Sequence, residues 1–108
     1  MKKECIFCKN IEGETPADFV YQDDLVVAFG DKYPQAPVHI LLVPRKHIRS
    51  INDLSENDGP LIARLFLKAK EIAKEKGIDM SGYKLFFNVE RGGGQYVFHI
   101  HLHLMGGW

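Results

Sequence analysis

The sequence lacks the features that would assign it to several broad classes of protein. No apolar run approaches the roughly 20 residues that a membrane-spanning helix needs, and residues 1–4 lack the apolar stretch of a secretion signal. The 14 basic residues balance the 14 acidic ones, so no basic excess favours non-specific binding to nucleic acid or to a membrane surface. There are only two cysteines. We therefore expect a cytoplasmic protein without a disulfide.

Repeats, low-complexity tracts and linkers are absent too, and the length suits one compact core, so we predict a single domain over residues 1–108. Short segments rich in β-branched and aromatic residues predict a sheet. The predicted strands are 19–22, 25–29, 38–43, 83–89 and 99–105. Residues 55–58 have the form of a capping box, and apolar residues then repeat at spacings of three and four until Gly77. Residues 5–11 suit one or two further helical turns. The sequence thus predicts an α+β fold, with a mostly antiparallel five-stranded sheet, one long helix and a short N-terminal helix.

Three histidines alternate with apolar residues in the last predicted strand. Residues 99–105 read His-Ile-His-Leu-His-Leu-Met. Alternation places His99, His101 and His103 on one face, while the apolar residues between them face the core. Three imidazoles in a row on a rigid element indicate either a reaction site or a metal site. Neighbouring stems on that face are roughly 6.5–7 Å apart, which makes one metal shared by all three awkward.

The enzymatic interpretation rests on phosphorus chemistry. A neutral imidazole can attack an electrophilic phosphorus and form a covalent intermediate. Backbone N–H groups of a glycine-rich turn can neutralise phosphate oxygens, because the missing side chains allow close approach. A run of three glycines, Gly92 to Gly94, shortly precedes the histidines. The nucleophile and the phosphate-binding turn would therefore belong to one turn-strand unit.

At this point the sequence resembles a known family. Residues 99–105 match the His-φ-His-φ-His-φ-φ motif, with φ apolar, that defines the histidine triad (HIT) superfamily. Its Hint (histidine triad nucleotide-binding) branch is similar over nearly the whole chain. The further matching segments are 31–44, 44–48, Asn88, 93–95 and the closing Gly106-Gly107. The resemblance implies a HIT-like fold and a hydrolase or transferase acting at the α-phosphorus of purine nucleotides such as AMP or GMP, their phosphoramidates or adenylates. It also implies a homodimer.

The resemblance assigns roles residue by residue. His101 would be the nucleophile that forms a nucleotidyl intermediate, His103 would contact the phosphate and the leaving group, and His99 would support them. Asp31 would accept hydrogen bonds from the ribose hydroxyls, because a carboxylate offers only acceptors. The other implied nucleotide-binding residues are Lys32 beside it, Asn88, Gly94 and Gln95 at the phosphate, Phe7 and Phe29 at the base, Tyr96 near the leaving group, and His39 in a supporting role. Ordinary structural roles, in turns or in the core, are the alternatives for Asp31, Asn88, Phe7 and Phe29.

Two departures from the family pattern bear on substrate preference. Tyr96 stands three residues before the first triad histidine, where Hint-like proteins usually carry serine or threonine. The chain also stops at Trp108, whereas many relatives carry a longer tail. Both affect the expected leaving group more than the nucleophile. They motivate an alternative function, a nucleotide-binding or scaffold module with weak or no turnover.

The two cysteines form a C-x-x-C pair, Cys5 and Cys8. That spacing can hold one Zn²⁺ in a tight turn, and histidines would have to supply the remaining ligands. The resemblance to bacterial HIT proteins with this N-terminal pair implies His47 and His99 as those ligands. Four protein ligands make such a zinc structural, and catalysis should require no metal. A redox pair and inert buried thiols are the alternatives.

Overall fold

The computed structural model describes residues 4–108. Residues 1–3, which belong to the segment that we expect to lack a secretion signal, lie outside the described residues. The sheet has five strands in the order β1-β2-β3-β5-β4, and every neighbouring pair is antiparallel. The strands are β1 (Phe19–Gln22), β2 (Val26–Gly30), β3 (Val38–Pro44), β4 (Tyr83–Phe86) and β5 (Leu102–Gly106). The helices are α1 (Ile6–Ile11) and α2 (Gly59–Glu75), with 3₁₀ turns at Ile51–Asp53, Glu56–Asp58 and Arg91–Gly93. The predicted α+β fold is confirmed.

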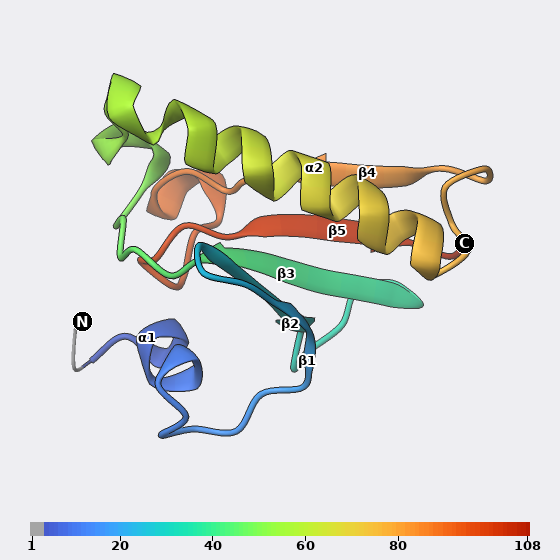
Figure 1. Cartoon of the computed structure of the whole chain (residues 1–108), viewed down its shortest axis with the longest axis horizontal. Coiled ribbons are helices and arrows are strands. Elements are labelled where there is room, and N and C mark those ends of the chain that lie inside the picture. The colour runs from blue at the N-terminus through green and yellow to red at the C-terminus, as the bar shows by residue number, and fades with distance from the viewer. Residues whose placement is uncertain (1–3) are drawn as a thin grey trace.

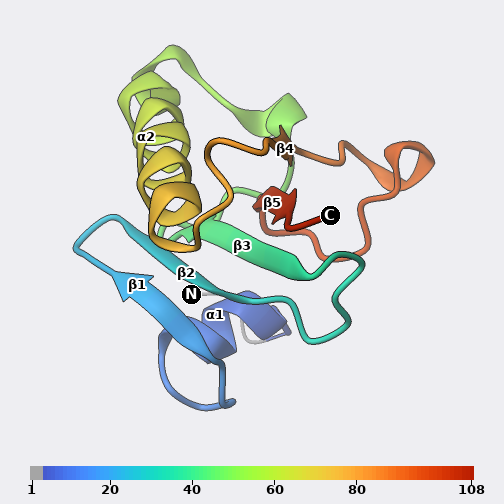
Figure 2. The same cartoon turned by 90° about the vertical axis from the view of Figure 1, so that its right-hand side faces the viewer.

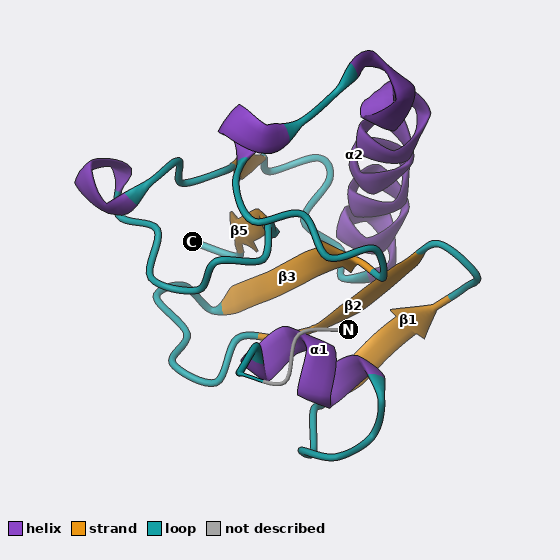
Figure 3. Cartoon of the chain, turned by 90° about the vertical axis from the view of Figure 1, so that its left-hand side faces the viewer, coloured by secondary structure: helices purple, strands orange, loops and turns teal. Residues whose placement is uncertain are grey.

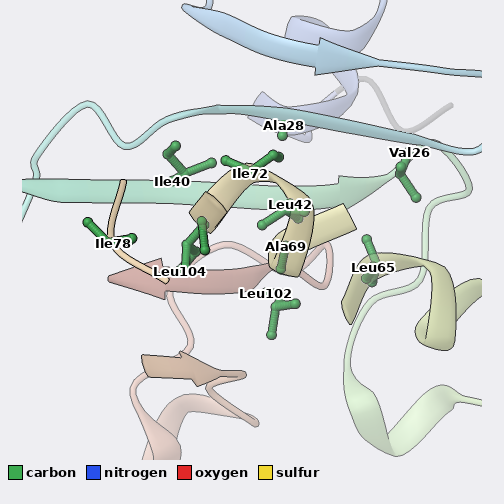
Figure 4. Close-up of a cluster of buried hydrophobic side chains, with 11 residues drawn as sticks. Val26, Ala28, Ile40, Leu42, Leu65, Ala69, Ile72, Ile78, Leu102 and Leu104 are labelled. Carbon is green, nitrogen blue, oxygen red and sulfur yellow. The ribbon is translucent and has the colours of Figure 1, made fainter. Parts of the chain in front are cut away.

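The two helices lie on opposite faces of the sheet (Figures 1 and 2). The long helix α2 covers one face, and the apolar side chains of β2, β3 and β5 that point toward it form the larger core. Figure 4 shows side chains of this core, among them Leu42, Leu102 and Leu104 of the sheet and Leu65 and Ala69 of the helix. Leu102 and Leu104 face this core as predicted. Among residues 4–108, no helix combines the length and apolar character that a membrane crossing requires.

A second, smaller apolar cluster lies under α1 on the opposite face. It contains Phe7 and Cys8 of the helix together with Val27, Phe29 and Leu41 of the sheet. Figure 3 shows α1 against β1 and β2, on the side of the sheet away from α2. The two faces thus have separate roles: one buries α2, and the other carries the N-terminal segment and the inward side chains of the histidine row.

The start of the histidine strand is the main difference from the prediction. β5 begins at Leu102 rather than at His99, so only His103 of the three histidines is in the ladder. Leu102 pairs with Leu42, and two residues further the partner strand ends at Pro44, which has no N–H to donate. The Pro44 carbonyl instead bonds the His99 ring at 2.7 Å, and the Ile100 N–H donates to the Ile48 carbonyl.

Other boundaries shift by smaller amounts. β2 begins at Val26, and the N–H groups of Leu25 and Val26 both donate to the Asp23 carboxylate in the preceding turn. β4 ends at Phe86 rather than at residue 89, and Asn88 turns to the glycine loop instead. The capping residues close a 3₁₀ turn before α2, with the Ser55 N–H donating to Asp58 at 3.0 Å. Gly77 ends the helix with a left-handed φ of 73°.

Candidate active site

A pocket of about 510 Å³ opens beside β5 on the α1 face of the sheet. Most of the site residues named from the sequence line it. They are Phe7, Asp31, Lys32, His39, Asn88, Gly94, Tyr96, His101 and His103. These residues come from α1, the β2–β3 segment, the loop after β4 and the histidine segment, and the fold brings them to one cavity. Three of the named catalytic and nucleotide-binding residues do not line it: His99, Gln95 and Phe29. The named metal ligands Cys5, Cys8 and His47 lie outside it as well.

The hydrogen bond of His101 fixes which ring nitrogen carries the proton. Its Nδ1 lies 2.8 Å from the backbone carbonyl of His99. A carbonyl can only accept, so Nδ1 is the donor, and a neutral ring then keeps its lone pair on Nε2. The side chain is 8% exposed, and burial lowers its pKa. At neutral pH the ring is therefore uncharged, with Nε2 left as the basic atom of a side chain that lines the pocket.

His39 and His103 are joined by a second chain of hydrogen bonds. The Gln35 N–H donates to His39 Nδ1 at 3.0 Å, so this nitrogen is an acceptor and Nε2 carries the proton. His39 Nε2 lies 3.0 Å from His103 Nδ1 and 3.3 Å from the Asp31 carboxylate. His103 Nδ1 must then accept, which leaves the proton on its Nε2. Among the described residues, that buried Nε2 has no hydrogen-bond partner.

Burial also keeps these two rings uncharged. It lowers the pKa of His103 to about 4, with the neighbouring His101 and His39 adding to the effect. The pKa of His39 is lowered by burial as well, although the Asp31 carboxylate opposes this. Phe86 stacks on the His103 ring at 4.7 Å and 6°, directly across the β4–β5 ladder. His103 thus presents a fixed N–H donor next to the nucleophile candidate, and their ring centroids are 4.9 Å apart.

The loop over residues 88–95 is shaped by its own side chains. The Asn88 amide donates to the Gly93 carbonyl at 2.9 Å, and Gly94 has a left-handed φ of 88°. Gln95 is 1% exposed, and its amide bonds the backbone of Glu90, Arg49 and Val97. The backbone N–H groups of Gly94 and Gln95 donate to carbonyls of the same turn. In this conformation, therefore, Gln95 braces the loop, and the expected donation from these two N–H groups to a phosphate does not fit.

Phe29 and His99 also lie behind the pocket wall. Phe29 is 4% exposed and packs against Phe7 with ring centroids 5.5 Å apart, so it supports a wall residue. His99 is completely buried, and its ring points to the cysteines. It reaches the pocket only through its carbonyl, which accepts from His101.

The cysteine pair and two histidines form a compact cluster. The ligand atoms of Cys5, Cys8, His47 and His99 all lie within 4.8 Å of one another. His99 Nδ1 is 3.4 Å from Cys5 Sγ and 3.5 Å from Cys8 Sγ, and His47 Nδ1 is 3.3 Å from Cys8 Sγ. The Nε2–H of His99 donates to the Pro44 carbonyl, which leaves Nδ1 with a lone pair facing the sulfurs. Two sulfurs and two imidazoles are a donor set that fits Zn²⁺.

The three triad histidines do not share a metal group. Among residues 4–108, a second cluster of suitable ligands consists of Asp31, His39 and His103, and His101 belongs to neither cluster. The hydrogen bonds described above account for the contacts of that second cluster. The geometry therefore does not support one catalytic metal held by the whole row.

Several pocket residues were not anticipated from the sequence. They are Ile6, Tyr33, Gln35, Leu41, Phe86, Val97 and Met105. Phe86 could have been found from the sequence, because antiparallel pairing of the last two strands places it opposite His103. Gln35 acts through its backbone N–H, which any residue except proline would provide, so no sequence pattern marks it.

Comparisons with known proteins agree with the sequence motif and the fold. A family model described as "Scavenger mRNA decapping enzyme C-term binding" (DcpS_C) matches residues 4–107. A purine nucleoside phosphoramidase of Escherichia coli (strain K12) is 50% identical over 107 residues, 99% of this chain and 90% of that protein. A HIT family hydrolase of Legionella pneumophila Philadelphia 1 has 50% identity and a TM-score of 0.96, covering 97% of this chain and 94% of that one. A histidine triad protein of Clostridium difficile has 42% identity and a TM-score of 0.97, covering 100% and 94%. With the motif, the fold and these relatives in agreement, the chain belongs to the histidine triad (HIT) family.

Proposed function

We propose that this chain is a nucleoside phosphoramidate hydrolase that acts at the α-phosphorus of purine nucleotides through a nucleotidyl-His101 intermediate. The observation that carries the proposal is the hydrogen bond from His101 Nδ1 to the His99 carbonyl, at 2.8 Å. It leaves a neutral imidazole with its lone pair on Nε2, in a ring that lines the pocket. The phosphoramidase activity named for the 50% identical relative supports the same reaction class.

In the first step the Nε2 lone pair forms a bond to phosphorus while the bond from phosphorus to the leaving nitrogen breaks. The leaving nitrogen keeps that electron pair and takes a proton from solvent, while the unpartnered Nε2–H of His103 hydrogen-bonds it or a phosphate oxygen. In the second step water attacks phosphorus, and the N–P electron pair returns to His101. The proton lost by the water passes to solvent, and His103 keeps its Nε2–H throughout. The products are the nucleoside monophosphate and the free amine.

The remaining pocket residues would hold the nucleotide. Asp31 would accept from the ribose hydroxyls with lone pairs that its bonds to the Tyr33 N–H and His39 leave over. Lys32 would add positive charge beside the phosphate or ribose, and Asn88 would bond phosphate or nucleoside oxygens. Phe7, backed by Phe29, would form the apolar wall for the base.

We further propose that the cysteine cluster binds one structural Zn²⁺ through Cys5, Cys8, His47 and His99. The donor set and its spacing support this assignment. Burial raises the pKa of the Cys5 thiol, so a metal would be needed to hold it as the thiolate at neutral pH. The zinc would fix the N-terminal segment and would take no part in the two chemical steps. The assembly we propose is a homodimer.

Replacement of the nucleophile tests the reaction. Wild-type protein should release AMP from adenosine 5′-monophosphoramidate, and His101→Ala should lose nearly all turnover while it still binds AMP. Mass spectrometry of quenched wild-type reactions should find a nucleotidyl adduct on His101. Leu102→Ala is the matched control, since its buried side chain faces α2: it should cost about 2–5 kcal/mol of stability and still turn over substrate.

Two outcomes would contradict this proposal. Equal turnover by wild type and His101→Ala would remove His101 from the mechanism. Nucleotide affinity without turnover of any phosphoramidate, acyl-adenylate or dinucleotide polyphosphate would favour the binding module instead.

A further inference from the structure

Phe7 stands between the two cysteines and faces the pocket. Cys5 caps α1, and its Sγ accepts from the Cys8 N–H at 3.3 Å, so both thiols belong to the first turn of this helix. The Phe7 ring meets His101 edge-on at 5.0 Å and His99 at 6.1 Å. It also lines the pocket. One side chain therefore connects the sulfur cluster to the ring of the proposed nucleophile.

His99 makes a second connection by its backbone. Its ring faces the two sulfurs, while its carbonyl orients the His101 ring. A displacement of the His99 ring that shifts its backbone would move the carbonyl that holds the His101 tautomer. The cluster and the pocket thus share two adjoining links, the Phe7 ring and the His99 carbonyl.

The position of α1 depends on such contacts. A helix of six residues is too short to be stable by itself, so packing and the cluster must hold it. Without a metal, the thiol–imidazole contacts of 3.3–3.5 Å are weak, because a thiol is a poor hydrogen-bonding group. A metal would replace them with bonds to all four ligands and would fix Phe7 against His101.

We propose that Phe7 is a positioning residue that couples occupancy of the Cys5–Cys8–His47–His99 centre to nucleotide affinity, while the His99 carbonyl couples the same centre to turnover. This inference rests on the hydrolase and zinc centre proposed above. It extends them, because the structural metal becomes an allosteric ligand of the pocket. Coupling between two sites is reciprocal, so nucleotide must then tighten the metal by the factor by which metal tightens nucleotide.

The test is a thermodynamic cycle in which zinc removal and Phe7→Leu are applied separately and together. Calorimetry measures the Kd of AMP for zinc-loaded and chelator-treated protein, and elemental analysis measures zinc content. Phe7→Leu keeps all four ligands and should retain zinc, yet raise the Kd about three- to tenfold through loss of the ring contacts. Removal of zinc from wild type should raise the Kd by a similar factor, and removal from Phe7→Leu should add little. The kcat should fall on zinc removal in both proteins.

The reverse measurement keeps the test valid if zinc-free protein does not stay folded. Competition with a chromogenic chelator gives the zinc affinity with and without saturating AMP. AMP should tighten zinc about three- to tenfold in wild type and leave it unchanged in Phe7→Leu. Phe19→Leu is the matched control. Phe19 lies on β1 and packs against Phe29, with the ring centroids 5.8 Å apart, but it does not line the pocket. The variant should keep the full coupling.

The measurements distinguish failure of the coupling from failure of the zinc centre and from failure of the proposed hydrolase. Additive effects of zinc removal and Phe7→Leu on the Kd, or zinc affinity unmoved by AMP, would overturn the coupling while leaving the hydrolase and the zinc centre intact. Protein that takes up no zinc yet hydrolyses phosphoramidate would overturn the coupling and the centre but keep the hydrolase. Protein that binds zinc but neither binds nor hydrolyses nucleotides would overturn the proposed function itself.

Discussion

The chemistry of the pocket depends on three protons, each assigned by one hydrogen bond. The Gln35 N–H makes His39 Nδ1 an acceptor, His39 then donates to His103, and His103 keeps its proton on Nε2. The His99 carbonyl places the proton of His101 on Nδ1. Two backbone groups therefore decide that one ring offers a lone pair and its neighbour offers an N–H. That division of roles is what in-line displacement at phosphorus requires.

The depressed pKa of His103 leads to a prediction on pH dependence. Protonation of His103 at Nδ1 would break its hydrogen bond from His39, so the active arrangement is present above the folded pKa of about 4 and is lost as the pH falls through that value. We expect kcat/KM to change by less than about twofold between pH 8 and pH 6. An imidazole with an ordinary pKa of about 6.5 would lose about fourfold over that range. Initial rates on adenosine 5′-monophosphoramidate, corrected for uncatalysed hydrolysis, measure this, and a half-maximal point near pH 6.5 would contradict it.

At the same scale, the sequence could identify two histidines that line the pocket but not the orientation of the side chains around them. The alternating pattern and the family motif named His101 and His103, and both line the pocket. The motif alone could not reveal that Gln95 turns inward to brace a loop, because the amide partners at Glu90, Arg49 and Val97 are set by tertiary folding. The role of the His99 carbonyl was equally hidden, since every residue has one.

Among the elements, the loop over residues 88–95 is held in a conformation that its sequence alone would not favour. Glu90 has a φ of 60°, unusual for a residue with a side chain. Its carboxylate accepts from Arg49 and Asn52, and its N–H donates to the Gln95 amide oxygen. These contacts fix the strained residue, so the loop presents Asn88 and Gly94 to the pocket in one arrangement.

Gly94 offers a test of that loop. A Cβ at this position would lie 3.3 Å from the Asn88 amide nitrogen, on a backbone with a left-handed φ. Gly94→Ala should therefore cost about 1–2 kcal/mol in urea unfolding and raise the Kd of AMP, because Asn88 must shift. Gly92→Ala is the control, since nothing lies within 4 Å of a Cβ there. Equal AMP affinity in the two variants would show that the loop does not shape the nucleotide site.

The strands show where local pattern is sufficient and where it is not. β1 matches its prediction because Phe19–Gln22 is a self-contained run of β-forming residues before an aspartate turn. β5 begins three residues later than the alternation predicts, because its ladder partner ends at Pro44. A strand's length depends on its neighbour, and the pairing of β5 with β3 across some 60 residues is not readable from either segment.

At the scale of the whole molecule, the sheet separates stability from chemistry. Its α2 face buries the larger apolar core, so most of the hydrophobic free energy of folding comes from side chains that point away from the pocket. The α1 face carries the pocket, the histidines and the cysteine cluster. Polar and strained groups can therefore collect on one face without disrupting the core on the other. The predicted cytoplasmic location is a property of the whole protein that a single chain does not test, and it stays a prediction.

The proposed homodimer is also a whole-molecule property, and two features support it. Among the strands of residues 4–108, β4 is hydrogen-bonded only to β5, so it is an edge strand, and exposed edge strands in proteins are usually covered. On the same side of α2, Phe66 is 40% exposed and its ring lies 6.1 Å from Phe87, just beyond β4. A second copy related by a two-fold axis would cover both features at once.

Two adjacent residues of α2 make a matched pair for testing the dimer. Phe66 lies toward the β4 side, whereas Leu67 shares a surface hollow with Leu25, in the turn between β1 and β2. Sedimentation velocity at micromolar concentration should give twice the chain mass for wild type. Phe66→Lys should raise the dimer dissociation constant at least about tenfold, because it places a charge in the buried contact. Leu67→Lys adds the same charge but should leave the dimer intact, since it faces the β1 edge. A monomer mass for wild type at all concentrations, or equal dissociation by the two variants, would rule out an interface on the β4 side.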